Sequence, residues 1–147
     1  SRTGPLVPEP VAAIRARIVE IRTIGKGDTV SYGATWRSPG VRRIATVPVG
    51  YADGYRRSLS NRAEALLGGR RIPVAGRVTM DMTMFDVTGT DAALGDVVTL
   101  LGREGADEIT VGELAERSEL SPYEILTGLR ERLPRRYVHE EQGAALA

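Results

Sequence analysis

The chain has 147 residues with no cysteine, and its 20 basic and 19 acidic residues leave a net charge of +1. This length predicts one domain with a sizeable core, while the balanced charge argues against a nucleic-acid or membrane surface. The lack of cysteine excludes disulfides and cysteine-ligated zinc within the sequence, and it is typical of a cytoplasmic protein.

The scarce residue types narrow the chemistry further. The single histidine, His139, argues against a histidine-based metal site. The single lysine, Lys26, lies in the polar run Gly25-Lys26-Gly27-Asp28, where nothing apolar lowers the pKa of an amine. We interpret it as a solvated turn residue and not as a Schiff-base lysine. No apolar run reaches the roughly 18 residues of a membrane helix, and no signal peptide opens the chain.

Both ends are predicted to lie outside the folded part. Residues 1–10 contain three prolines without periodicity, which predicts a linker. The chain begins with Ser1 and not with methionine, so we expect it to be processed, trimmed or part of something longer. Residues 139–147 are predicted to form a flexible tail, which leaves 11–138 as the domain.

The sequence of the first half of the domain predicts β-strands. Residues 11–24 come close to a period-two alternation and become rich in β-branched side chains, which predicts one long strand. A Gly-Lys-Gly-Asp loop then leads into a second strand over 29–36, and the two are expected to form a hairpin. Residues 44–49 predict a short apolar strand, with Pro48 marking its edge or its end.

The methionine-rich segment follows. Residues 70–87 predict two strands around Gly76. Met82 and Met84 fall on one apolar face at period two and are assigned to the core. Asp81 falls on the opposite face, and a carboxylate on a mostly buried strand needs a partner or a chemical role.

Helical signals appear only near the C-terminal end. A buried strand over 97–102 precedes capping boxes at Thr110 and Ser121, which predict two short helices, and a last strand is expected over 133–138. The fold class is therefore mainly β with two short helices near the C-terminal end. Hairpins at this spacing fit a barrel or a sandwich, and we favour a β-barrel-like arrangement.

Two stretches are candidates for chemistry. Tyr32, flanked by small residues in VSYGATW, is placed either to exchange protons or to pack in a strand. The run GYADGY contains an Asp-Gly turn. It is either a tight connection with two exposed aromatics or a loop that presents Tyr51, Arg56 and Arg57 to an anionic ligand. The sequence contains no metal cluster, nucleotide loop or Ser-His-Asp set.

Four stretches taken together resemble one known family. VSYGATW, VGYADGYRR, GRVTMDMTMFDV and SPYEIL occur in the order found in the C-terminal domain of bacterial alanine racemase, and the resemblance covers about 11–137. The family is an isomerase that uses pyridoxal phosphate. The resemblance implies an N-terminal (β/α)8 barrel that holds the cofactor on a lysine and is absent here. It also implies a homodimer in which each β domain reaches into the partner's barrel.

The resemblance also implies roles for individual residues. Tyr32 matches the acid/base that exchanges the α-proton on the face opposite the cofactor lysine. A tyrosine with a pKa of about 10 needs a cationic neighbour for this, which in the family comes from the partner barrel. Met80 matches a residue whose main-chain amide contacts the substrate carboxylate. The remaining matches are to the substrate corridor (Tyr51, Arg57), to orienting groups (Arg77, Asp81) and to a hydrogen-bond donor for the cofactor phosphate (Tyr123).

Each of these roles has a plainer alternative. Tyr51 and Tyr123 are also ordinary packing residues, Arg77 a surface ion-pair partner, and Met80 a core side chain. If the family roles hold, the surface that normally meets a barrel is exposed in this chain, and we expect apolar and aromatic exposure around Tyr32, Tyr51 and Met80.

Three hypotheses for function follow. The first is a domain of an alanine racemase that makes D-alanine for peptidoglycan precursors in the cytoplasm, inactive alone and completed by its barrel. The second is a free-standing, non-catalytic interaction module. The third keeps the racemase chemistry with another amino acid, such as serine, lysine or arginine, since the resemblance implies that selectivity depends largely on the absent barrel.

Overall fold

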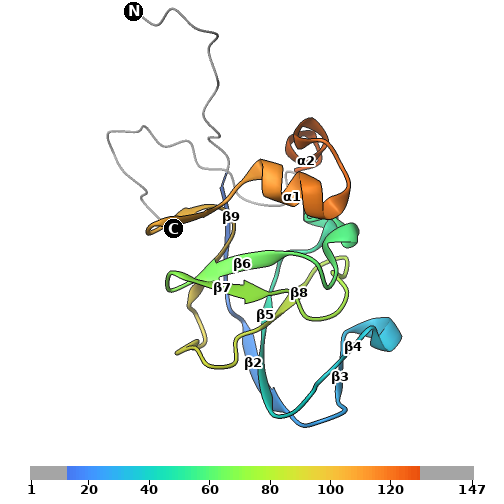
Figure 1. Ribbon diagram of the computed structural model, residues 1–147, viewed down its shortest axis with the longest axis vertical. Helices are drawn as coiled ribbons and strands as arrows, with labels where there is room; N and C mark the ends of the chain where they lie inside the picture. Colours follow the sequence, from blue (N-terminus) through green and yellow to red (C-terminus); the bar gives the residue numbers. More distant parts are fainter. Residues whose placement is uncertain (1–12, 130–147) are drawn as a thin grey trace, which may run out of the picture.

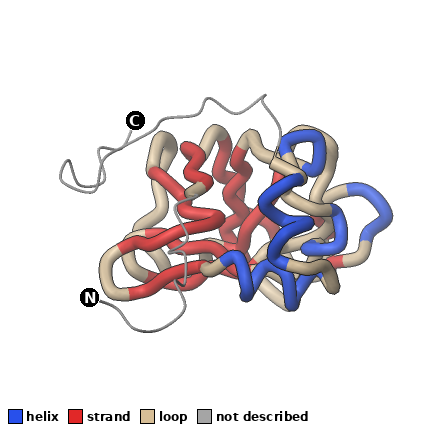
Figure 2. Tube along the Cα trace, turned by 90° about the horizontal axis from the view of Figure 1, so that it is seen from above, coloured by secondary structure: helices blue, strands red, loops and turns tan. Residues whose placement is uncertain are grey.

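Strands dominate the molecule, and the two α-helices lie together at one end of it (Figures 1 and 2). The computed structural model of the protein describes residues 13–129, with Tyr32 described by its backbone. The mainly β class and the two predicted helices are confirmed. The strands form three sheets, which do not close on themselves as a barrel would. The arm over 1–10, the strand expected over 133–138 and the tail over 139–147 lie outside the described residues.

The largest sheet has five strands in the order β1-β9-β6-β7, with β10 also paired to β9. Its members are β1 (Ile14–Arg17), β6 (Glu64–Leu67), β7 (Arg70–Pro73), β9 (Val97–Glu104) and β10 (Asp107–Ile109). All its pairs are antiparallel. Gly68 and Gly69 join β6 to β7 with φ of 56° and 78°, and this pair of positive angles is what a two-residue hairpin turn requires. The predicted strand over 97–102 is confirmed as most of β9.

A second sheet has the order β2-β5-β8, made of β2 (Glu20–Ile24), β5 (Arg42–Val47) and β8 (Thr83–Asp86). The prediction of one strand over 11–24 is wrong, because the chain changes sheets in its middle. The Ile18 amide donates to the Asp96 carbonyl beside the first sheet, whereas the next amide, of Val19, donates to Thr46 in the second. Alternating side chains reveal extended backbone but not which neighbour each half pairs with. Pro48 follows the last residue of β5, as predicted for a strand end.

The stretch predicted as a strand over 29–36 is a short hairpin with a helical turn at its tip. β3 (Thr29–Val30) pairs with β4 (Trp36–Arg37), and the 3-10 turn η1 (Tyr32–Ala34) joins them. Ser31, Gly33 and Ala34 have φ of 66°, 81° and 49°, and left-handed residues cannot continue a strand. Tyr32 is therefore a turn residue and not a strand residue.

The two strands predicted around Gly76 are also shorter than expected. β7 ends at Pro73 and β8 begins at Thr83, so the residues between them form a loop apart from one bridge from Val74 to Phe85. The assignment of Met82 to the core is wrong, because its side chain is 44% exposed, while Met84 is half-buried against a small apolar cluster.

The helical end follows the predicted capping signals. α1 (Val111–Ser118) begins after Thr110, whose side chain accepts a hydrogen bond from the Glu113 amide, and α2 (Pro122–Thr127) begins after Ser121, which accepts one from Glu124. α1 buries Val111, Leu114 and Ala115 against the main apolar core, which also includes residues from both larger sheets. None of the helices between residues 13 and 129 is long and apolar enough to cross a membrane.

Candidate functional site

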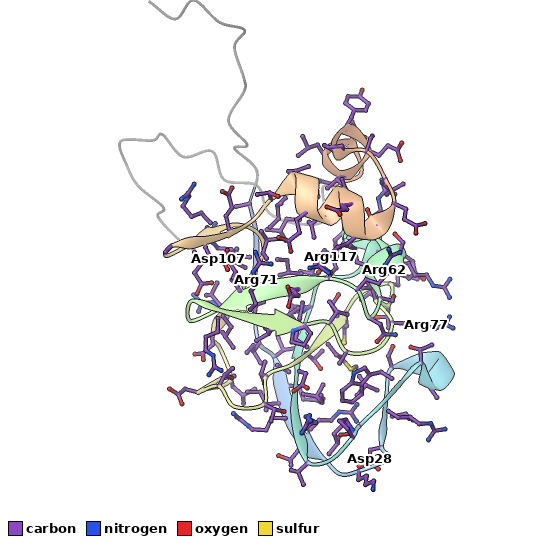
Figure 3. All side chains as sticks on the ribbon, in the orientation of Figure 1. Asp28, Arg62, Arg71, Arg77, Asp107 and Arg117 are labelled. Atoms are coloured by element: carbon purple, nitrogen blue, oxygen red, sulfur yellow. The ribbon has the colours of Figure 1, made fainter. Side chains whose placement is uncertain are left out.

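The turn that carries Tyr32 is fastened to the loop that carries Arg77. The Ser31 hydroxyl donates to the Arg77 carbonyl oxygen at 3.0 Å. The Arg77 guanidinium lies across Gly33, where an added Cβ would be 2.9 Å from its Nε atom, and Figure 3 shows Arg77 reaching toward this turn. Two of the predicted site residues are thus brought together. Gly33 has no side chain, and that is what allows the arginine this close approach.

The Arg77 loop continues into a tight tip at Met80 and Asp81. The Thr79 amide donates to the Met82 carbonyl at 3.0 Å, and the Met82 amide returns a bond to the Thr79 hydroxyl at 3.1 Å. Within residues 13–129, the Met80 amide donates no hydrogen bond. The Met80 side chain is 51% exposed, and Asp81 is exposed as well, so neither is a core residue. An unused amide at an exposed tip is able to bind an acceptor such as a carboxylate.

The turn that carries Tyr51 packs backbone to backbone against this tip. η2 (Tyr51–Asp53) donates from the Tyr51 amide to the Thr79 carbonyl at 2.9 Å and from the Ala52 amide to the Met80 carbonyl at 3.0 Å. Any Cβ on Gly50 would overlap those two carbonyl groups, so the approach requires glycine. Tyr51 is 39% exposed beside Met80, as expected for a surface that another domain covers.

The second aromatic of the GYADGY run behaves differently. Tyr55 is buried at 1% exposure, so the alternative with two exposed aromatics is wrong. Asp53 is also buried, and its carboxylate accepts from the Gly50 amide at 2.9 Å, which closes the turn. The Asp-Gly pair predicted a turn. It did not predict which of the two nearby tyrosines is exposed (Tyr51) and which is buried (Tyr55).

Arg57 lies on the next turn, η3 (Arg57–Leu59), and is exposed. The end of this turn also contacts the Arg77 loop, because the Ser60 hydroxyl accepts from the Val78 amide at 2.8 Å. The turns of Tyr32, Tyr51 and Arg57 and the loop of Met80 are therefore connected by direct hydrogen bonds. Ser60 lies outside the motifs singled out in the sequence, and Ser31, although it is part of VSYGATW, had been given no role.

Tyr123 stands apart from these turns, on α2. Its side chain is 75% exposed in the first turn of the helix. A link to the GYADGY run exists through Arg56, which donates from Nη2 to the Glu124 carbonyl at 2.9 Å. The sequence suggested that Arg56, like Arg57, faces an anionic ligand. In the structure Arg56 instead bonds to the backbone of α2, the helix that carries Tyr123.

The pKa shifts in the described residues concern Tyr55, Arg71 and Asp107, which are not among the predicted site residues. Burial raises the pKa of the Tyr55 hydroxyl, with the nearby charge of Glu113 acting in the same direction. A side-chain hydrogen bond from Arg71 lowers the pKa of Asp107, and the reciprocal bond raises that of Arg71. These groups belong to a structural cluster around α1. Between residues 13 and 129, no group of three or more acidic or histidine side chains could hold a metal ion.

Comparison with known proteins shows the family of this chain. The family model for alanine racemase, C-terminal domain, matches residues 11–137. An alanine racemase of Thermodesulfovibrio yellowstonii is 42% identical over 134 residues, which are 90% of this chain and 37% of that protein. The crystal structure of alanine racemase from Bacillus anthracis with bound L-Ala-P aligns with a TM-score of 0.86 and 40% identity, over 92% of this chain and 34% of the other.

A racemase of a different amino acid is almost as similar. The histidine racemase of Leuconostoc mesenteroides subsp. sake aligns with a TM-score of 0.85 and 34% identity, over 92% of this chain and 36% of that one. The fold is therefore that of the β domain found in amino-acid racemases. The chain belongs to the alanine racemase C-terminal domain family, and it spans about a third of the length of the relatives that it matches.

The described residues fit only part of what pyridoxal phosphate needs. Covalent attachment requires a lysine, and Lys26, the one lysine of the sequence, is exposed in a polar turn next to Gly27. The exposed phenol of Tyr123 is able to donate one hydrogen bond to a phosphate group.

Proposed function

We propose that this domain completes the active site of an alanine racemase, an isomerase that interconverts L-alanine and D-alanine for peptidoglycan precursors in the cytoplasm. The observation that carries the proposal is the hydrogen-bonded grouping of the Tyr32 turn, the Tyr51 turn and the Met80 tip in a chain of this family. The barrel of a partner subunit in a homodimer supplies the rest of the site.

Each residue has a defined task in this proposal. Tyr32 donates or accepts the proton that is exchanged at the α-carbon of the substrate, and a cationic group of the partner barrel favours its ionised form. The free Met80 amide donates to the substrate carboxylate, and the exposed Arg57 attracts that carboxylate along the corridor past Tyr51. Bound pyridoxal phosphate supplies an electron sink for the charge that develops at the α-carbon.

Orientation is the task of the remaining groups. Arg77 and Asp81 flank Met80 and fix how its amide faces the substrate. The Tyr123 hydroxyl donates to the cofactor phosphate, which sets the distance between α2 and the barrel. Tyr51, Arg57, Met80 and Tyr123 are exposed in this chain, and their contacts need a partner, so the domain alone is expected to be inactive.

The test is a chimera in which this chain replaces the matching third of the Thermodesulfovibrio yellowstonii alanine racemase. With pyridoxal phosphate, the chimera should racemise alanine, and the chain alone should not. Tyr32→Phe should lower kcat by about 10²- to 10⁴-fold, the usual contribution of a general acid or base. Met80→Leu should leave KM within about twofold, because the amide and not the side chain binds. An inactive chimera beside an active parent enzyme would sink the proposal.

A second candidate is the same chemistry on another amino acid, favoured by the similarity to a histidine racemase. Racemisation of alanine, serine, lysine, arginine and histidine by the natural enzyme that carries this domain decides between them. A higher kcat/KM for any amino acid other than alanine would replace the substrate in the proposal. A barrel-binding chain that supports no turnover with any of them would instead support the non-catalytic interaction module.

A further inference from the structure

Asn61 is placed where the parts of the site meet, although no sequence motif marked it. It follows η3 and has a left-handed backbone with φ of 56°. Its amide donates to the Gly76 carbonyl at 3.0 Å, and its Oδ1 atom accepts from the Gly76 amide at 2.7 Å. This reciprocal pair fixes the start of the loop that leads through Arg77 to Met80.

The same carboxamide also reaches the Tyr32 turn. Its Nδ2 atom donates to the Thr35 hydroxyl at 3.0 Å, and Thr35 is the residue that ends η1. The other end of η1 is tied at Ser31, whose hydroxyl donates to the Arg77 carbonyl. The Ser31 hydroxyl and the Asn61 carboxamide therefore connect the two ends of the Tyr32 turn to one loop, which begins at Gly76.

The turn needs such restraint because its backbone is unfavourable by itself. Ser31 and Ala34 have φ of 66° and 49°, in a region that residues with a Cβ seldom occupy. Conformations of this kind persist only where surrounding contacts enforce them. The Gly76 backbone adds to the restraint, since an added Cβ there would lie 2.7 Å from the Val30 carbonyl, directly before Ser31.

We infer that Asn61 is a positioning residue: its carboxamide couples the Tyr32 turn to the Met80 loop, so that the acid/base and the carboxylate-binding amide keep one relative geometry. This inference rests on the proposed function for its catalytic consequence, but the coupling itself is a property of this chain. Catalysis depends steeply on such geometry, because a displacement of about 1 Å can cost on the order of 10²-fold in rate.

The coupling is tested first in the 147-residue chain without activity. Asn61→Gly retains the left-handed backbone and removes the carboxamide. The matched control is Glu119→Gly, at another left-handed position with φ of 61° at the end of α1. Amide hydrogen exchange at Gly76 and Ala34 should rise at least tenfold in Asn61→Gly and stay within twofold in the control. Unchanged exchange in Asn61→Gly would overturn the inference, whatever the domain's function.

The catalytic consequence is tested in the chimera described above. Asn61→Gly should lower kcat by about ten- to a hundredfold and raise KM, because it releases both the Tyr32 turn and the Met80 loop. Thr35→Val cuts only the link to the Tyr32 turn, so it should lower kcat and leave KM unchanged. Asn61→Asp keeps an acceptor for Gly76 and offers its second oxygen to the Thr35 hydroxyl, so it should restore most of the activity.

A general loss of stability predicts a different pattern. It would lower the active fraction equally in Asn61→Gly and Glu119→Gly, and it would leave KM unchanged in all variants. That pattern would overturn the inference. An inactive chimera with the unchanged domain would count against the proposed function, while the hydrogen-exchange result would still decide the role of Asn61.

Discussion

The two sides of this domain use charged residues in opposite ways. Beneath α1, Arg71 bonds to Asp107 at 2.9 Å, to Glu113 at 2.8 Å and to Glu64 at 3.3 Å, and Arg117 joins two of the same carboxylates (Figure 3). We call these five residues the ion cluster. Around the Tyr32 turn and the Met80 tip, which we call the site face, the joints are hydrogen bonds that involve backbone groups and short side chains.

The difference separates stability from function. In the ion cluster every charged side chain forms an ion pair with another side chain of the same chain. The cluster is therefore poorly suited to bind a charged ligand. On the site face, exposed side chains and the unused Met80 amide project from backbone that is firmly tied. Such an arrangement keeps the geometry fixed while leaving the functional groups for a partner. Mutations in the ion cluster should therefore change stability alone, and those on the site face should change activity as well.

The largest effect is expected from Gly50→Ala on the site face. The new Cβ overlaps the carbonyl groups of Thr79 and Met80, and backbone atoms cannot yield as a flexible side chain can. Overpacking of this kind costs about 1–3 kcal/mol. Urea unfolding of the chain should show this loss, and KM of the chimera should rise because the Met80 amide moves.

A matched control for Gly50 lies in α1. Gly112→Ala places its Cβ 3.7 Å from the Thr110 hydroxyl, an ordinary contact, and replaces glycine within a helix. This change should raise stability by about 0.5–1 kcal/mol with no effect on KM. Equal stability of Gly50→Ala and the unchanged chain would show that the two turns are not held in the close contact described above.

The second effect tests the ion cluster. Arg71→Met leaves three carboxylates without their shared cation and should lower the free energy of unfolding by about 1–2 kcal/mol, since the side chain is 31% exposed and partly screened. Arg71→Lys should not restore the loss, because one ammonium group cannot reproduce the forked geometry. As a control, Arg103→Met breaks a pair whose arginine is 70% exposed and should cost less than about 0.5 kcal/mol. A change in kcat of the chimera would contradict the proposed division of roles.

Much of the fold was predictable from the sequence because its signals are local. The capping residues Thr110 and Ser121 determine where the helices begin, and the apolar run of β9 forms a buried strand in any sheet. The break of the first strand at Ile18 was not predictable, since it depends on which distant strand each half meets. Left-handed Ser31 and Ala34 were equally hidden, because their conformation is imposed by tertiary contacts.

The candidate site was predictable only through whole motifs. Residue types and spacing left Tyr32 and Met80 with core alternatives, and the resemblance to a family selected among them. What the motifs did not reveal were the residues that connect them, such as Asn61 and Ser60. Both residues act through hydrogen bonds to backbone groups at distant positions in the chain. Periodicity carries no information about such contacts.

The third effect concerns Tyr55, which interacts electrostatically with Glu113 and Arg117 of the ion cluster. Its hydroxyl is buried and has no hydrogen-bond partner among residues 13–129, so Tyr55→Phe should be neutral or stabilising by up to about 1 kcal/mol. The raised pKa adds a second signature. Above the ordinary value of 10.0 the unfolded chain loses this proton and the folded chain keeps it, so stability falls as pH rises. Tyr55→Phe should remove that alkaline loss, whereas Tyr51→Phe should not. A large destabilisation by Tyr55→Phe would mean that the hydroxyl is bonded.

The smallest effect is at Asp107, the most exposed carboxylate of the ion cluster. The hydrogen bond from Arg71, supported by the Glu108 amide, holds the pKa of Asp107 below its ordinary 3.8. The folded state therefore binds fewer protons, and this contribution to stability is present above about pH 4 and is lost as pH falls through the lowered pKa. Asp107→Asn should make the melting temperature less sensitive to acid below about pH 4, slightly, because salt and water screen an exposed pair. In an Arg71→Met background the same substitution should have a smaller effect, since the larger cause of the lowered pKa is gone and only the Glu108 amide remains. An equal change in both backgrounds would mean that Asp107 draws its stability from another partner, and the ion cluster would then not act as one unit.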